Sequence, residues 1–251
     1  MRHRVLDRQG RDFAPTGERH RATLITSNMK SAGKIKYIDF HTHNRSSDAD
    51  TVTVLNLMAG DDVPAEFTAS TLFSAGIHPW QLTESNLADL QTELLLTVAH
   101  PHVALIGEAG FDRMQGGPRE VQQRAFIFQA EMASEMDKPM VIHCVKGWDD
   151  LRQARKEVMP ARPWVIHGFR GNSILAASLA DDGFWFSLGS LGLKPEVLKA
   201  LSHERILLET DESGERIADV YRKFGEVAGY DAETAEELMR RNFNALLNFR
   251  L

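Results

Sequence analysis

The sequence predicts a (β/α)8 TIM barrel, because short apolar segments recur along the chain with helical segments mostly between them. The apolar segments number eight and lie at approximately 35–40, 52–57, 72–77, 103–107, 140–142, 164–166, 184–188 and 206–209. Strands that alternate with helices form parallel sheets, since each parallel connection needs a crossover. Eight such units favour a closed barrel over an open sheet.

Helical periodicity is clearest after the fourth and eighth strand segments. The segment 118–137 begins at Pro118, which suits the first turn of a helix, and its apolar residues share one face: Val121, Ala125, Phe128 and Met132. The last segment, from Asp231, repeats this spacing at Ala235, Leu238, Leu246 and Phe249. We expect it to complete the outer ring of helices.

The connection after the first strand is too short for a helix. Residues 44–51 separate the first two strand segments, whereas parallel strands are usually joined by roughly a dozen residues or more. We therefore expect a shortened or missing first crossover helix, unless the second strand is assigned wrongly.

The composition describes an ordinary globular protein with an acidic surface. The chain has 251 residues, 43% hydrophobic and 25% charged, and a net charge of -6. That charge gives no footprint for nonspecific binding of nucleic acid, although a basic or metal-filled cleft is compatible with it. No apolar run approaches the roughly 18 residues of a membrane-spanning helix. Cys144 is the single cysteine, which fits a reducing compartment and predicts a cytoplasmic protein.

Residues 1–34 differ from the rest of the chain. They contain arginines at positions 2, 4, 8, 11, 19 and 21 and no sustained apolar periodicity. We expect a disordered N-terminal extension there, followed by one barrel over residues 35–251. Met29 is an alternative start, so it stays open whether residues 1–28 belong to the native protein.

Side chains able to bind a metal follow the strand segments. His41 and His43 are one residue apart at the end of the first strand, and period-two alternation sends both to the same side. Later strand segments end in Glu108, His143, His167 and Asp211. Because the carboxyl ends of barrel strands meet at one mouth, we expect these side chains to converge.

Four imidazoles and two carboxylates exceed what one tetrahedral ion needs. We therefore expect two divalent ions bridged by Glu108, with the other ligands divided between them: His41, His43 and Asp211 on one, and His143 and His167 on the other. Such a site activates water and stabilises both the attacking and the leaving oxygen of a phosphodiester. The metal stays open among Mg, Mn and Zn, because the same ligands accept several ions.

Two further positions follow from strand alternation. Cys144 is expected to point away from its neighbour His143 and to pack in the core. Trp185 and Phe186 are adjacent in the seventh strand segment, so we expect them to divide between the barrel interior and the layer of helices.

The strand-end segments carry a family resemblance. They read DFHTH at 39–43, GIHP at 76–79, IGEAGFD at 106–112, PMVIH at 139–143, HGF at 167–169 and ETD at 209–211. In these segments the chain resembles the TatD-type metal-dependent DNases, a branch of the amidohydrolase-like barrels. The resemblance implies a barrel fold, dependence on divalent metal, and hydrolysis of phosphodiester bonds in DNA, often from a 3′ end.

The chain departs from the family pattern at three places. The family usually has an arginine two residues after the histidine at His143, whereas Val145 and then Lys146 stand here. Lysine is a point charge, while arginine offers phosphate a planar fork. Residues 212–214 are Glu-Ser-Gly where Ser-Pro is usual, and Trp80 stands where a histidine is common. These differences concern the identity and affinity of the substrate rather than metal binding.

Two enzyme hypotheses follow. The first is a TatD-like metal-dependent hydrolase, a phosphodiesterase or DNase of the 3′-5′ exonuclease type. Asp211 and Glu108 are its predicted catalytic groups, with Asp211 accepting the proton of metal-activated water. The alternative is an amidohydrolase-type enzyme that acts on a small ester, lactone or amide, since one barrel supports many chemistries. A non-catalytic barrel that retains its metals is a third interpretation.

The expected binding partner is DNA or a small-molecule substrate. We expect neither an obligate protein partner nor binding to a membrane.

Five more residues are candidates for supporting roles. His78, Lys146 and Arg170 lie near the predicted mouth and are candidates to contact substrate phosphate. Asp112 and Glu209 are candidates to orient histidine ligands through the second ring nitrogen. The alternative for His78 is a structural histidine, and for Lys146 and Arg170 it is a solvated surface cation. For Asp112 and Glu209 it is a helix cap or a solvated charge.

Overall fold

Eight parallel strands form one sheet in chain order, from β1 to β8. The computed structural model describes residues 35–46 and 48–248. The strands are β1 (Tyr37–Thr42), β2 (Thr51–Met58), β3 (Thr71–Gly76), β4 (Val103–Asp112), β5 (Met140–Val145), β6 (Trp164–Ile166), β7 (Trp185–Leu188) and β8 (Ile206–Leu208). Each predicted strand segment overlaps one of them, so the predicted barrel is confirmed. The extension predicted at 1–34 lies outside the described residues.

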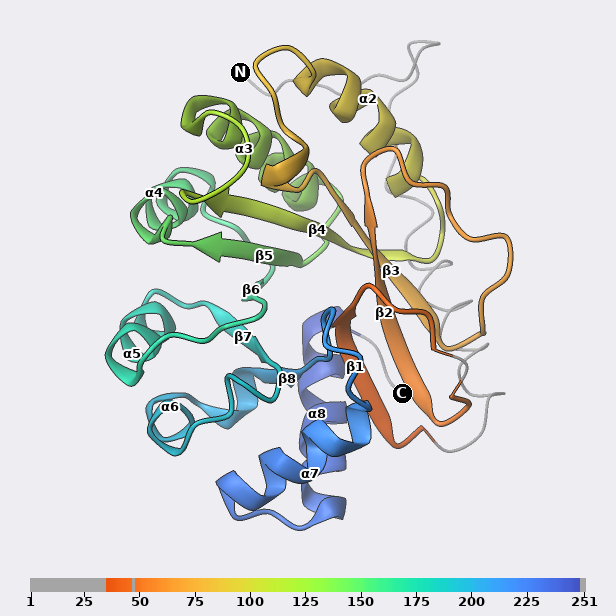
Figure 1. The fold of residues 1–251 in the computed structure, drawn as a ribbon, viewed down its shortest axis with the longest axis vertical. Coiled ribbons are helices and arrows are strands. Elements are labelled where there is room, and N and C mark those ends of the chain that lie inside the picture. The colour runs from red at the N-terminus through yellow and green to blue at the C-terminus, as the bar shows by residue number, and fades with distance from the viewer. Residues whose placement is uncertain (1–34, 47, 249–251) are drawn as a thin grey trace.

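Helices cover most of the outside of the barrel (Figure 1). They are α2 (Leu87–Val98), α3 (Arg119–Glu135), α4 (Trp148–Val158), α5 (Ser173–Asp181), α6 (Pro195–Ala200), α7 (Ile217–Ala228) and α8 (Ala232–Leu247), with short 3-10 turns η2 (Pro79–Gln81) and η3 (His203–Arg205). The helices predicted at 118–137 and from Asp231 correspond to α3 and α8. None of the helices in the described ranges is both long and apolar enough to cross a lipid bilayer.

The chain joins β1 to β2 without a crossover helix. The described part of residues 43–50 forms only bends, a turn and irregular backbone, and β1 still pairs in parallel with β2. The expected loss of the first crossover helix is therefore confirmed. Residues 59–70, between β2 and β3, also contain no helix, which the sequence pattern did not predict. The helices in Figure 1 accordingly leave β2 without one of its own.

The core has two layers. An inner cluster, contributed by strands around the barrel, contains Ile38, Phe40, Val52, Val54, Leu72, Ala104, Leu105, Val141, Val165 and Leu207, and Phe243 and Leu246 of α8 pack against it. An outer cluster joins the strands to the helices. Trp185 packs against the inner cluster and Phe186 belongs to the outer one, so their predicted division is confirmed. Cys144 packs against the outer cluster, as expected.

Side chains help to close the barrel between β8 and β1. Among the described residues, Thr42 and Asp211 form an isolated backbone bridge at this seam. Further down β1, the hydroxyl of Tyr221 on α7 accepts a hydrogen bond from the Ile38 N–H (3.0 Å) and donates one to the Ile38 carbonyl (3.3 Å). A phenol thus satisfies both backbone groups of a buried strand residue, which would otherwise lack partners at the seam.

We predict that Tyr221→Phe lowers the free energy of unfolding by about 1–3 kcal/mol, because it leaves the buried Ile38 N–H unpaired. Urea unfolding followed by circular dichroism measures this change. Tyr37→Phe is the matched control, since the Tyr37 ring packs edge-on against Tyr221 at 5.1 Å but its hydroxyl makes no hydrogen bond within the described ranges. Equal effects of the two substitutions would contradict the role of the Tyr221 hydroxyl.

Candidate metal centre

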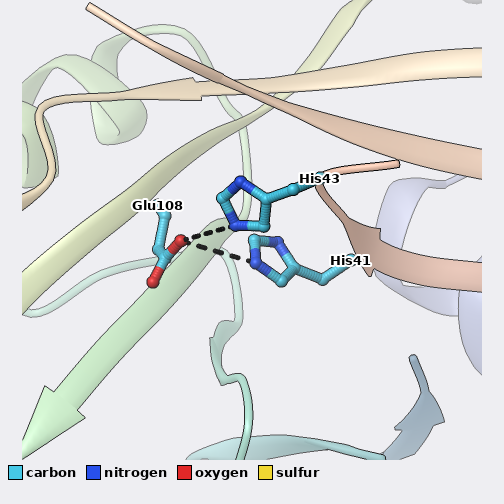
Figure 2. Close-up of side chains that lie close together, drawn as sticks. All are labelled: His41, His43 and Glu108. Atoms are coloured by element: carbon cyan, nitrogen blue, oxygen red, sulfur yellow. Dashed lines mark ion pairs between the residues drawn. The ribbon is translucent and has the colours of Figure 1, made fainter. Parts of the chain in front are cut away.

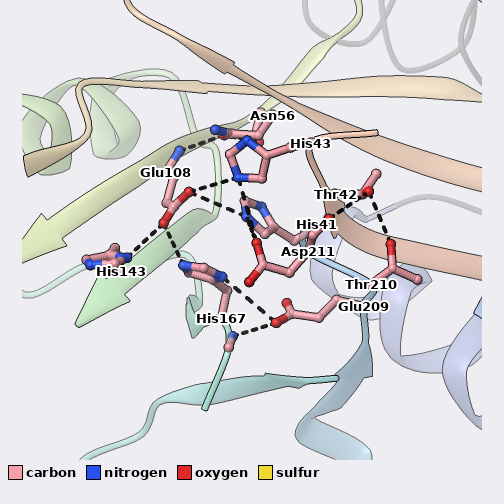
Figure 3. A network of polar contacts seen from close by, with 12 residues as sticks. His41, Thr42, His43, Asn56, Glu108, His143, His167, Glu209, Thr210 and Asp211 are labelled. Atoms are coloured by element: carbon pink, nitrogen blue, oxygen red, sulfur yellow. Dashed lines mark hydrogen bonds and ion pairs between the residues drawn. The ribbon is translucent and has the colours of Figure 1, made fainter. Parts of the chain in front are cut away.

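The six predicted metal ligands lie within strands or shortly after their C-terminal ends. His41, Glu108 and His143 belong to β1, β4 and β5, with Glu108 in the middle of its strand, while His43, His167 and Asp211 follow β1, β6 and β8. Figure 2 shows His41 and His43 directed at Glu108. Figure 3 shows His143, His167 and Asp211 arranged around the same group. The structure therefore brings these predicted side chains together at one mouth.

An irregularity in β1 directs His41 into the barrel. The pairing of β1 with β2 shifts between Asp39 and Thr42. Ile38 and Phe40 pack in the inner cluster, so strict alternation would place His41 outside. The shift adds one residue to β1, as a β-bulge does, and the His41 side chain is fully buried beside Glu108.

The strand β4 has the same kind of irregularity at Glu108. Its register with β5 shifts between Ile106 and Ala109, and both of these residues pack in the outer cluster. Two residues three positions apart share a face of a strand only if one extra residue lies between them. Glu108 thereby turns inward and is 4% exposed. Gly110 then allows close approach to β5, since a Cβ there would lie 1.7 Å from the His143 carbonyl oxygen.

Five histidines surround the Glu108 carboxylate. Its Oε1 lies 2.7 Å from His167 Nε2, 2.8 Å from His143 Nδ1 and 3.2 Å from His78 Nε2, and its Oε2 lies 3.4 Å from His43 Nε2 and 3.5 Å from His41 Nε2. The backbone N–H of Glu108 donates to Asn56 Oδ1 at 2.9 Å. Both ends of the residue are therefore anchored, and its carboxylate is the centre of the site.

Asp211 forms the β8 side of the site. Its Oδ1 lies 3.8 Å from Nε2 of both His41 and His43. Its backbone, at a left-handed φ of 53°, donates to the His41 carbonyl at 2.9 Å and accepts from Thr42 Oγ1 at 3.1 Å. The preceding Thr210 donates two hydrogen bonds to the buried carboxylate of Asp39 (Oγ1 at 2.6 Å, N at 2.9 Å). These bonds hold the Asp211 carboxylate at the mouth, where it is 25% exposed.

The ligand atoms fit a divalent metal. His41 is fully buried, yet neither of its ring nitrogens makes a hydrogen bond among the described residues. Unpaired buried nitrogens are costly unless something binds them. Three groups each have ligand atoms within 4.8 Å of one another: His41, His43 and Glu108; His41, His167 and Asp211; and His78, Glu108 and His143. Mixed imidazole and carboxylate sets of this kind suit transition-metal ions.

Electrostatics keep Glu108 ionised. Burial alone would raise the pKa of this carboxyl, but the charge on His167 and hydrogen bonds from His143 and His167 hold the pKa well below its usual range. Burial opposes a charge on His167 as well, and the nearby Glu108 outweighs it and raises the pKa of His167 to about 9. The hydrogen bond to Glu108 likewise raises the pKa of His43. The buried carboxylate thus needs positive charge, which protonated imidazoles or a bound cation supply.

Asp112 and Glu209 contact histidines through the ring nitrogen that does not face Glu108. Asp112 Oδ2 lies 3.3 Å from His143 Nε2, and Glu209 Oε1 lies 3.9 Å from His167 Nδ1. Glu209 Oε1 also accepts a hydrogen bond from the Gly168 N–H at 2.5 Å. These positions suit carboxylates that orient histidine ligands, and that role stays a prediction.

His78 lies deeper in the site than expected. The sequence suggested a position at the rim, but the side chain is buried and burial lowers its pKa. It belongs instead to one of the three ligand groups. The strand-end rule that found the other histidines applies equally to His78, which follows β3, and would have grouped it with them. The exposed rim position above β3 belongs to Trp80, which is 52% exposed.

Lys146 and Arg170 lie in the loops after two neighbouring strands, β5 and β6. Lys146 follows β5 and is exposed, and its ammonium group makes no hydrogen bond or ion pair with any residue that the structure describes. Arg170 lines a pocket of about 300 Å³ next to Asp211, together with Glu212 and Glu215. One predicted phosphate contact is therefore an unpaired cation, and the other lies among carboxylates.

Known proteins resemble the chain in both sequence and fold. The metal-dependent hydrolase YabD of Bacillus subtilis, described as uncharacterized, is 28% identical over 196 residues, which are 66% of this chain and 76% of YabD. The 3′-5′ ssDNA/RNA exonuclease TatD of Klebsiella pneumoniae is 31% identical over 174 residues, 62% of this chain and 65% of that enzyme. The crystal structure of YjjV, a TatD homologue of Escherichia coli, superposes with a TM-score of 0.70 at 20% identity, over 86% of this chain and 99% of YjjV.

The family described as TatD related DNase matches residues 61–248. This range includes strands β3 to β8 and all the helices from α2 to α8. Because the match covers most of the chain, the protein belongs to the family of TatD related DNases.

Proposed function

We propose that the chain is a metal-dependent hydrolase of phosphodiester bonds that removes nucleotides from the 3′ end of single-stranded nucleic acid in the cytoplasm. The observation that carries this proposal is the convergence of five histidines on the buried carboxylate of Glu108, with Asp211 beside two of them. Relatives named as 3′-5′ ssDNA/RNA exonucleases, in Klebsiella pneumoniae and Escherichia coli, support the choice of substrate.

The proposed site would hold two ions with Glu108 shared between them. His41, His43 and Asp211 would hold one, and His143 would hold the other with His78 as a further ligand. His167, predicted to join His143, has a ligand atom within 4.8 Å of those of His41 and Asp211 and could serve either ion. Divalent ions such as Mg, Mn or Zn supply polarisation of the phosphoryl group and lower the pKa of the attacking water. Glu108 contributes the negative charge that keeps the imidazoles and the ions together.

Asp211 is the proposed general base. It is the most exposed carboxylate of the cluster, and its Oδ1 faces His41 and His43. As the water oxygen bonds to phosphorus, Asp211 takes the proton from the water. The bond from phosphorus to the 3′ oxygen then breaks, and the proton passes to that leaving oxygen.

A second candidate function has one observation in its favour. The pocket of about 300 Å³ beside Asp211 is lined by Glu209, Glu212 and Glu215, with Arg170 as its cation. Such a lining repels a polyanion and suits a neutral or cationic molecule. A small ester, lactone or amide hydrolysed by the same ligands is therefore the alternative.

We predict that Asp211→Asn lowers kcat on 5′-labelled single-stranded DNA by roughly 100- to 10,000-fold, because it removes the proton acceptor. Asparagine tolerates the left-handed backbone at this position, so the fold should persist. Calorimetry with Mn²⁺ should show that at least one ion still binds. Glu212→Gln is the matched control and should keep the activity. Full activity of Asp211→Asn would exclude its role as base.

We predict that metal stabilises the protein through His41. In the wild type freed of metal by chelation, Zn²⁺ or Mn²⁺ at about 100 times its Kd should raise the free energy of unfolding by about 2.7 kcal/mol. His41→Ala should lose most of this gain. His100→Ala, which removes an imidazole from the turn before β4, should retain it. Thermal unfolding with and without the ion measures the effect, and an equal gain in both variants would exclude His41 as a ligand.

We predict that Lys146→Ala raises the KM for single-stranded DNA by up to about fivefold, as expected for loss of one exposed phosphate contact. A neutral ester should be unaffected. Lys156→Ala removes the same charge from the end of α4 away from the mouth and serves as control. Equal changes for DNA and the neutral ester would contradict a phosphate contact at Lys146.

A further inference from the structure

Trp80 presents an aromatic ring to solvent beside the metal centre. It lies in η2, directly after β3, and is 52% exposed. Its ring lies edge-on to the rings of His78 (4.9 Å between centroids, 88° between planes) and His143 (5.9 Å, 76°). The indole therefore lies next to two members of the proposed ligand set and is still accessible from outside.

The ring is held in one orientation. Its Nε1–H donates to Asp112 Oδ2 at 2.7 Å, and the same oxygen lies 3.3 Å from His143 Nε2. The backbone N–H of Trp80 donates to His78 Nδ1 at 3.2 Å. Asp112 also accepts from the backbone of Met114 at 2.7 Å, so this carboxylate ties the indole to the loop after β4. A ring fixed in this way loses little entropy when a ligand binds to it.

Packing alone does not account for the position of this tryptophan. Its polar N–H is already satisfied, so the surface that remains exposed is apolar. The other tryptophans of the chain are buried or partly buried, with Trp164 only 1% exposed. An exposed, fixed aromatic ring at the edge of a catalytic mouth is a surface for a flat ligand.

We propose that Trp80 stacks on a nucleobase adjoining the scissile phosphate. This inference rests on the proposed function and specifies its substrate: a single-stranded end, because a base inside a duplex is stacked on both faces and only a base free of the duplex can turn toward the indole. Stacking of a base on an aromatic side chain tolerates every base, since each has a π face. Trp80 thus provides affinity without sequence preference, near the exposed Lys146 that follows β5.

The test compares single-stranded oligonucleotides that differ in one base. One is intact, and the other two lack the base of the 3′-terminal or the penultimate nucleotide. For the wild type, loss of one of these bases should lower kcat/KM by about 5- to 150-fold, mainly through KM. In Trp80→Leu the intact and abasic substrates should react alike, at the rate of the wild type on the abasic one. Trp80→Phe should restore most of the preference.

Two results would overturn the stacking role. If Trp80→Leu lowers turnover of intact and abasic substrates by the same factor, then the indole acts only through Asp112 and His143 as a positioning residue. If the wild type reacts equally with all three substrates, no base is bound.

An equilibrium measurement separates this inference from the proposed hydrolase. Calorimetry compares thymidine 5′-monophosphate with deoxyribose 5-phosphate, which lacks the base, on the Mn²⁺-loaded protein. Tighter binding of the nucleotide by wild type and not by Trp80→Leu supports stacking, even if no oligonucleotide is cleaved and the nuclease proposal fails. Equal binding of the two compounds by wild type overturns stacking, whatever the activity.

Discussion

The buried carboxylate of Glu108 needs positive charge close to it, and five histidines at the mouth of the barrel surround it. A carboxylate removed from water is stable only if cations or hydrogen-bond donors replace the lost solvation. Strands β1, β4 and β5 and the loops after β3 and β6 each direct a side chain to this point. Because none of these side chains belongs to an α-helix in the described part of the chain, the centre depends on the register of the sheet.

The register is adjusted at the two positions where alternation would fail. In β1, Ile38 and Phe40 fill the interior, and a regular strand would then turn His41 outward. In β4, Ile106 and Ala109 pack outside, and only the extra residue between them lets Glu108 face inward. Bulges next to active sites often redirect one side chain in this way. Here they let one strand supply both core residues and ligands.

These bulges explain what sequence reasoning could and could not foresee. The eight strands were predictable because apolar runs with strand-end ligands repeat, and the absent first crossover was predictable from the length of residues 44–51. The irregular strand pairing was not predictable, since a bulge does not change the amino-acid composition of a strand. The strand β4 continues to Asp112 rather than ending at 107, because Ala109 to Asp112 pair with β5 beyond the bulge. The absence of a helix between β2 and β3 could not be predicted from length, because the segment 59–70 is long enough to hold a short helix.

Side chains also help to close the barrel between β8 and β1, where backbone pairing is limited to an isolated bridge among the described residues. Tyr221 satisfies Ile38, and the pair formed by Asp39 and Thr210 secures the turn into Asp211. The fold and the site therefore share the seam between β8 and β1: the bonds that close it also hold the carboxylate nearest to solvent in place.

The two sides of the mouth differ in charge, and this difference constrains how a nucleic acid could lie there. Trp80 and Lys146 follow β3 and β5, whereas Glu212 and Glu215 line the pocket beside β8. A phosphate backbone is attracted by the first side and repelled by the second. A strand whose last phosphodiester reached Glu108 and Asp211 would therefore run over β3 to β5. In that orientation a strand continuing past Asp211 would bring phosphates against Glu212 and Glu215, so the charge distribution favours a strand that ends at the metal centre.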